Sequence, residues 1–304
     1  LGQVGEPVSV RGWLRASQGR ARLTHWPVPG EHPAMVASTV LALALFAGQD
    51  PAPQQPSNTL PDITVQQPAS DPVRRFVAGV TLPGEHGRYV GQIARWDHRL
   101  CVDVVGGAPE VNGYLTAQIA ANFRSLDIPH GAPGCTPTVA VVISTDADAF
   151  ARTFTRLNRN HMFSTRPEAV ARFLGPSRPV RWQHLVRTDQ RPLPQSRLRV
   201  ASTRAIQQTI ILVDAGRAAA APLDSLAAYL AFVALVDLPS EPSTADQRTI
   251  LSLFDESGAR PPRALTRSDR AFIDALYRVT PDMMFGLQQA EIETRMRLNL
   301  ATPP

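Results

Sequence analysis

Residues 223–238 read Leu-Asp-Ser-Leu-Ala-Ala-Tyr-Leu-Ala-Phe-Val-Ala-Leu-Val-Asp-Leu. A helix at the surface of a globular protein has one apolar stripe and one polar face. A helix formed by this stretch would instead be apolar nearly all round. The sequence therefore predicts a central helix at 223–238 that is buried on every side.

The segments before this helix alternate between strand and helix patterns. Alternating or continuous β-branched runs, which are typical of strands, occur at 100–105, 138–143, 180–186 and 208–213. Helical spacing of apolar residues predicts helices at 111–123, 147–157 and 167–174. This pattern indicates an α/β or α+β sheet domain, and we expect an α+β fold with a mixed sheet and packed helices.

The C-terminal third is predicted to be helical. Thr266-Arg267-Ser268-Asp269 has the spacing of a capping box, in which the first and last residues bond each other's backbone N–H. Thr280-Pro281 places an N-cap residue before a proline at the first helical position. We therefore expect one helix to start after Thr266 and a last helix to run from Pro281 through Leu298.

An uncharged run at 36–47 follows the first methionine, Met35. A helix that spans a bilayer needs about 20 apolar residues, so this run fits the hydrophobic core of a secretory signal better. We expect residues 1–48 to be an upstream leader and signal peptide, cleaved between Ala44 and Ala52. A short buried helix and an unprocessed anchor are the alternatives, and residues 1–34 are interpreted as upstream translated sequence.

A segment rich in proline and glutamine follows at 49–72. It has too little apolar surface to fold and too many prolines for a helix, so we expect a disordered linker. The remaining residues, 73–304, are enough for one α+β domain by the usual size of domains.

The charge pattern argues against a nucleic-acid partner. The chain carries 31 basic residues, all of them arginine, against 26 acidic residues. The arginines are scattered among acidic residues and are not gathered into a stripe with aromatic residues, as nucleic-acid binding favours. We also expect no stable membrane span in the mature chain.

The two cysteines, Cys101 and Cys135, both follow the predicted signal. An even number of cysteines in an exported chain predicts a disulfide, and we expect these two to pair. Two buried free thiols are the alternative, which requires a cytosolic chain. A zinc site is not expected, because neither cysteine has another within two to four residues.

The last third resembles the metzincin-like zinc peptidases in the order of its segments: a strand, a buried helix, a short hydrophobic turn and a helix carrying Leu-Tyr. That family's helix holds His-Glu-x-x-His, in which two imidazoles bind zinc and the glutamate acts as base. The matching register starts at Ala227, so that Ala227, Ala228 and Ala231 stand where the ligands and the base belong. The resemblance thus implies a zincin-like fold without its metal site.

Two further segments carry this resemblance. The turn at 249–255, Thr-Ile-Leu-Ser-Leu-Phe-Asp, is similar to the family's Ser-Ile-Met-like turn, and 265–277 is similar to its Leu-Ser-x-x-Asp and Leu-Tyr tail. The chain also resembles an uncharacterised family of exported bacterial proteins, in which a Cys-Xaa-Pro stretch, here Cys135-Thr136-Pro137, precedes a buried helix and a Leu-Phe-Asp turn.

No catalytic residue, metal ligand or cofactor is predicted. The histidines show no i, i+4 pairing, and no Gly-x-Ser-x-Gly elbow occurs. If the zincin outline holds, one cleft would be lined by Asp214, Tyr229, Asp237, Asp255 and His184. The simpler interpretation, which we favour, is that the aspartates cap helices and turns and that His184 is a structural histidine.

These observations predict an exported protein, periplasmic or secreted, that acts as a non-catalytic zincin-like binding domain of the cell envelope. Its partner would be a protein or another envelope component. Two alternatives are a peptidase-like hydrolase with an unrecognised active site, for which Asp214, Asp237 and His184 are the first candidates, and a structural envelope protein tethered by its linker.

Overall fold

The computed structural model describes residues 71–302, except 84–90, 133, 163–166, 176–177, 191–197, 240, 245–246 and 256–259. The predicted leader and signal, and nearly all of the predicted linker, lie outside the described residues. The described part begins with α2 (Pro72–Val80), whose N-cap Asp71 accepts a hydrogen bond from the Val73 N–H. The last two residues of the segment predicted as linker, Asp71 and Pro72, are therefore part of the described helix and its cap.

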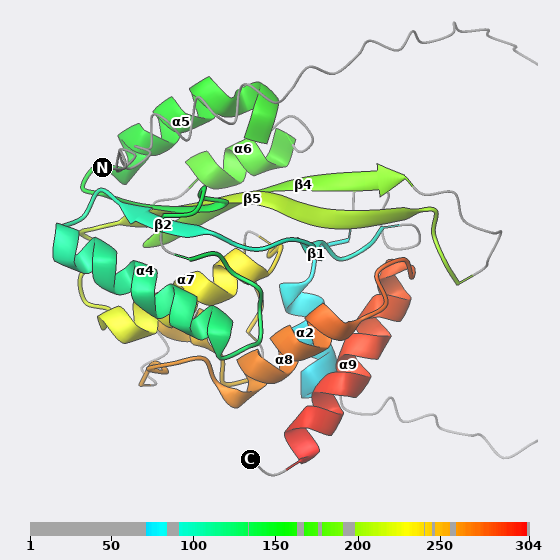
Figure 1. The fold of residues 1–304 in the computed structure, drawn as a ribbon. Coiled ribbons are helices and arrows are strands. Elements are labelled where there is room, and N and C mark those ends of the chain that lie inside the picture. Colours follow the sequence, from blue (N-terminus) through cyan, green and yellow to red (C-terminus); the bar gives the residue numbers. More distant parts are fainter. Residues whose placement is uncertain are drawn as a thin grey trace, which may run out of the picture. The chain divides into compact units, whose positions relative to one another are not determined.

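The longest strand, β5 (Ser202–Asp214), organises a mixed sheet of five strands (Figure 1). On one side β5 pairs with two parallel strands, with β1 (Arg95–Trp96) near its start and with β3 (Val139–Ser144) near its end. On its other side it pairs with the antiparallel β4 (Val180–Gln190). A parallel β2 (Val102–Val105) continues the sheet beyond β3. The mixed sheet predicted from the sequence is confirmed.

Helices cover both faces of this sheet (Figure 1). On one face, α5 (Ala147–Met162) and α6 (Pro167–Leu174) form a small core with alternate residues of β3 and β5. On the other face, α4 (Pro109–Arg124) and α7 (Leu223–Leu235) pack against the remaining alternate residues. Side chains alternate between the two faces along a strand, which explains why both cores draw on the same strands.

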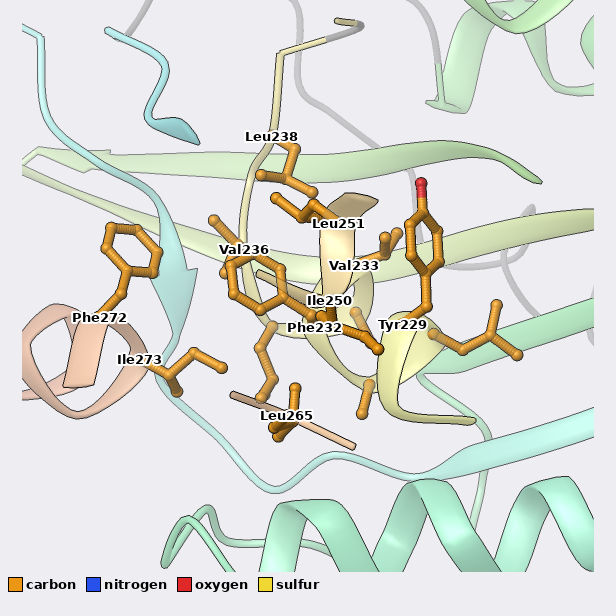
Figure 2. Packing of buried hydrophobic residues seen from close by; sticks show 14 of the residues in the cluster. Tyr229, Phe232, Val233, Val236, Leu238, Ile250, Leu251, Leu265, Phe272 and Ile273 are labelled. Atoms are coloured by element: carbon orange, nitrogen blue, oxygen red, sulfur yellow. The ribbon is translucent and has the colours of Figure 1, made fainter. Parts of the chain in front are cut away.

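The central helix α7 is buried as predicted. Every residue from Ser225 to Leu235 is buried. Figure 2 shows Phe232 and Val233 among Ile250 and Leu251, and the short 3-10 helix η1 (Ile250–Phe254) supplies those last two residues. The helix ends three residues before the predicted boundary, because Val236 adopts an extended conformation.

The C-terminal helices are α8 (Arg267–Arg278) and α9 (Phe285–Ala301). The predicted capping box at the start of α8 is confirmed in both of its hydrogen bonds. The predicted start of the last helix at Pro281 is wrong. The Pro281 carbonyl accepts hydrogen bonds from the Gln92 and Gln288 side chains, at 2.9 and 3.1 Å, and these bonds hold the segment in a turn.

The predicted disulfide joins Cys101 to Cys135 and links the start of β2 to the loop before β3. Gly131 makes room for it, because a Cβ atom at that position would lie 2.5 Å from the Cys135 sulfur. None of the helices in the described ranges is both long enough and apolar enough to cross a membrane.

Candidate functional site

The outer edge of β4 leaves backbone groups available for binding. Within the described part of the chain, β4 pairs only with β5. The Asp214 N–H donates to the Pro179 carbonyl at 2.9 Å, so Pro179 and Asp214 are a hydrogen-bonded pair of the antiparallel ladder. Since hydrogen-bonded and non-hydrogen-bonded pairs alternate along such a ladder, the N–H and C=O groups of Val180, Trp182 and His184 point away from β5.

Two of these three residues have no bonding partner for their outward groups in the described part of the chain. The His184 carbonyl accepts a hydrogen bond from the Gln183 side chain at 2.9 Å. The outward groups of Val180 and Trp182 make no hydrogen bond to the residues that the structure describes. A register shift between Leu185 and Val186 ends this arrangement. The unpaired edge is therefore a short segment centred on Val180 and Trp182.

Two adjoining cavities flank this segment, and we call them together the edge cleft. Four residues line both cavities: Arg178, Val180, Trp182 and Glu241. The first cavity, of about 280 Å³, extends toward α6 and the segment after α7. The second cavity, of about 310 Å³, extends toward α7 and η1. The outer edge of β4 thus borders two cavities, and each cavity is lined by different neighbouring elements.

The first cavity is lined by polar side chains that are buried and bonded to the protein. Arg181 is only 4% exposed and donates to an Asp148 carboxylate oxygen at 2.5 Å. His184 Nδ1 lies 2.7 Å from the Thr209 hydroxyl. A carboxylate oxygen of Asp237 lies 3.9 Å from the Arg204 guanidinium. Buried charges are costly unless they are paired, so these contacts indicate a structural role for the polar groups of this wall.

Aromatic and aliphatic side chains line part of the second cavity, beside the charged Arg178, Glu241 and Asp255. The ring of Tyr229 makes an edge contact with Phe254, with 5.2 Å between the ring centroids, and Leu251 and Trp182 line the same cavity. Tyr229 is 6% exposed, yet its hydroxyl makes no hydrogen bond to any described residue. Figure 2 shows this hydroxyl directed away from the aliphatic side chains of the core.

Burial raises the pKa of the Tyr229 phenol, and the nearby Asp255 carboxylate raises it further. The phenol is therefore neutral at physiological pH and can donate a hydrogen bond. Its position makes it a neutral hydrogen-bonding group in a cavity that Arg178, Glu241 and Asp255 also line.

An ion pair joins two of the residues that line both cavities. Arg178, just before β4, donates to Glu241, after α7, at 2.6 Å. Both side chains are partly exposed, and the Glu241 side chain is 78% exposed. Exposed ion pairs contribute little to stability, so a ligand could displace this one at small cost.

The structure distributes the five predicted cleft residues among three places. His184 and Asp237 line the first cavity, and Tyr229 and Asp255 line the second. Asp214 lies apart from the edge cleft, at the end of β5, where Arg217 bonds its carboxylate at 2.8 Å. Burial alone would raise the pKa of Asp214. The hydrogen bonds and the positive charge of Arg217 outweigh burial, so the pKa lies below its usual value.

The helix α7 presents Tyr229 to the edge cleft. The methyl groups of Ala227, Ala228 and Ala231, which stand where the resembling family has metal ligands and a base, are buried in the core cluster. In the described ranges, no group of three or more His, Cys, Asp and Glu side chains could hold a metal ion. The arrangement of the cleft supports binding by backbone pairing, apolar contact and one phenol.

Sequence reasoning missed Val180, Trp182, Arg178 and Glu241. The alternation at 180–186 identified a strand, but nothing local in it marks the strand as an edge. No protein-family model, curated protein or solved structure was found to match this chain.

Proposed function

We propose that this chain is a non-catalytic, zincin-like binding domain of the cell envelope, which receives an extended segment of a protein partner in the edge cleft. The observation that carries this proposal concerns Val180 and Trp182, which lie beside two cavities and whose outward backbone groups bond to none of the described residues. An extended peptide can add to such an edge as a further strand. Backbone hydrogen bonds then give affinity, and pockets for alternate side chains give specificity.

The short length of this edge also fits a binding role. A long flat edge strand invites aggregation, and proteins commonly limit it by bulges, charges or cover. Here the register shift after Leu185 limits the edge on one side, and Arg178, which is ion-paired with Glu241, directly precedes its other end. The remaining edge is long enough for a few residues of a partner.

The zincin-like part of the proposal is supported by the order of elements. A sheet strand, β5, is followed by the buried α7, the short η1 and then α8, which carries Leu276-Tyr277. The expected place in the cell, periplasmic or secreted, is supported by the disulfide, because disulfides persist in oxidising compartments.

The proposal is tested with decapeptides selected from a random phage-displayed library against the full chain. We expect the selected peptides to bind the parent and a Val180→Ala variant with similar affinity. A Val180→Pro variant removes the outward N–H of β4 without removing a bond to β5, and proline is tolerated at such edge positions. We expect this variant to melt like Val180→Ala and to lose at least tenfold in affinity.

Two outcomes contradict the proposal. Selection might yield no peptide that binds the folded chain in solution. Alternatively, the selected peptides might bind Val180→Pro as tightly as Val180→Ala, which would place their site away from the edge of β4.

A further inference from the structure

We propose that Asp103 keeps the outer edge of β2 from pairing with the same edge of a second copy of this chain. The edge of β2 is thus a surface suited to self-association, and the Asp103 carboxylate holds it closed. This inference is independent of the proposed function, because β2 and β4 lie at opposite ends of the sheet.

The outer edge of β2 carries backbone groups that are available for pairing. Among the described strands, β2 pairs only with β3. The Cys101 carbonyl accepts a hydrogen bond from the Val139 N–H of β3 at 2.9 Å. Because the backbone groups of successive residues point to opposite sides of a strand, those of Val102 and Val104 point outward. The Val104 N–H lies close enough to the Asp103 carboxylate to lower its pKa, and the other outward groups bond to none of the described residues.

This edge is accessible to another strand. A cavity of about 810 Å³ borders it, lined by the outward residues of β2 and by Gly113 and Ala117 of α4. A Cβ atom at Gly113 would find open space within 4 Å. The segment 129–131 covers the chain only before β2, where it bonds the N–H and C=O groups of Leu100.

Asp103 is the exception in the composition of β2. The other three residues of the strand are valines, which favour strands, whereas aspartate is depleted in them. The Asp103 carboxylate makes no ion pair with a described residue, although Arg99, Arg124 and His130 line the adjoining cavity. Burial raises its pKa, so the charge is held here at a cost. A valine would avoid that cost, and protection of the edge accounts for the carboxylate.

The position of Asp103 places it on the symmetry axis of such a pair. Two antiparallel copies of β2 would pair Val102 of one copy with Val104 of the other, in the isologous arrangement of a twofold dimer. The two Asp103 residues would then face each other in a non-hydrogen-bonded pair, with about 4.5 Å between their Cα atoms. Like charges directly opposite are destabilising, and charged side chains are a common protection of edge strands.

Shifted registers are closed by the two ends of β2. A shift toward the start of the strand would bring Leu100 into the pairing, but its backbone groups already bond the segment 129–131. A shift toward the end would bring in Gly106, whose φ of 91° departs from a strand conformation. The register with opposed Asp103 residues is therefore the one that the backbone favours.

The test compares Asp103→Val and Asp103→Asn, which remove the charge, with Asp103→Lys, which replaces it by the opposite charge. Each variant is made in the full chain and its molar mass is measured by light scattering over a range of protein concentrations. We expect both neutral variants to reach at least twice the molar mass of the parent as the concentration rises. Asp103→Lys should keep the mass of the parent, because two lysines repel each other as two aspartates do.

A second substitution locates the contact. In the Asp103→Val background, Val102→Pro removes an outward N–H of β2 and should restore the mass of the parent, whereas the matched control Val102→Ala should not. Parental mass in both neutral variants would overturn the inference, and the isosteric Asp103→Asn decides it alone if Asp103→Val fails to fold. Association that Val102→Pro leaves unchanged would place the contact elsewhere and would also overturn it. None of these outcomes bears on the peptide test at Val180.

Discussion

The indole N–H of Trp96 donates a hydrogen bond of 2.7 Å to the carbonyl of Ala234, in the last turn of α7. The last four carbonyls of a helix have no partner within it, and α7 ends inside the core, where water cannot supply one. Trp96 from β1 and Tyr277 from α8 therefore satisfy successive carbonyls at Ala234 and Leu235. These two bonds tie the end of the central helix to the sheet and to α8.

A Trp96→Phe variant tests this role. It keeps an aromatic ring against the core but leaves the buried Ala234 carbonyl without its partner, which costs about 1–3 kcal/mol. We expect the free energy of unfolding, measured by urea denaturation, to fall by that amount. A change within 0.5 kcal/mol would show that water or another group replaces the indole.

Asp269 joins η1 to the start of α8. Its buried carboxylate accepts hydrogen bonds from the Thr249 hydroxyl at 2.5 Å, the Ile250 N–H at 2.9 Å and the Thr266 N–H at 2.7 Å. Asp269→Ala leaves these three donors unsatisfied, so we expect a loss of about 3 kcal/mol or more in the free energy of unfolding.

The matched control for Asp269 is Asp274→Ala on the same helix. Asp274 is partly exposed, makes an i, i+4 ion pair with Arg278 and accepts a hydrogen bond from Asn299 at 2.9 Å. Exposed ion pairs contribute only about 0.2–1 kcal/mol. Denaturant titration of both variants should therefore separate them clearly. Equal losses would mean that the network at Asp269 adds nothing beyond an ordinary helix-surface contact.

The disulfide closes a loop between residues 34 positions apart in the sequence. Removal of such a bond from a secreted domain typically costs 2–5 kcal/mol. We expect the paired Cys101→Ser and Cys135→Ser variant to melt at a lower temperature than the parent. Thiol counting on the denatured parent without reductant should find none, and two free thiols would refute both the bond and the oxidising compartment.

The buried helix, the main strands and the capping box could be predicted because each depends on a local pattern of residues. The strand β1 could not, since Arg95 and Trp96 form too short a pattern and pair only through β5. The last helix was predicted to start too early because the Pro281 carbonyl is bonded by the side chain of Gln92, from far along the chain, and by that of Gln288, in the helix itself.

The edge cleft was harder to predict than the fold. Val180 and Trp182 have the composition of an ordinary half-buried strand, and their outward backbone groups follow from the strand order, which is a non-local property. Tyr229 was identified as a possible cleft residue through the resemblance. The absence of a bonding partner for its hydroxyl among the described residues emerges only from three-dimensional packing.

The alanines of α7 give a prediction about metal binding. We expect the parent to bind no stoichiometric zinc, and an Ala227→His, Ala228→Glu, Ala231→His variant to take up none either, because all three methyl groups are buried in the core. Larger polar groups there would overpack the core and strain it. Metal analysis checks both proteins. Zinc uptake by the variant alone would support a lapsed zincin site.

The burial of α7 predicts that aspartate substitution strongly destabilises the protein at one leucine of this helix and hardly at another. Leu230 is fully buried, whereas Leu223, at the first position of α7, is 40% exposed. Leu230→Asp places an unpaired carboxylate in the core, which costs several kcal/mol or forces its protonation, so we expect no cooperative unfolding transition and a collapsed near-UV circular dichroism signal. Leu223→Asp adds the same charge at a helix N-terminus, where the helix dipole favours it, and should melt within a few degrees of the parent. If Leu230→Asp melted like Leu223→Asp, the helix would be exposed on that side, and the core described for this domain would be wrong.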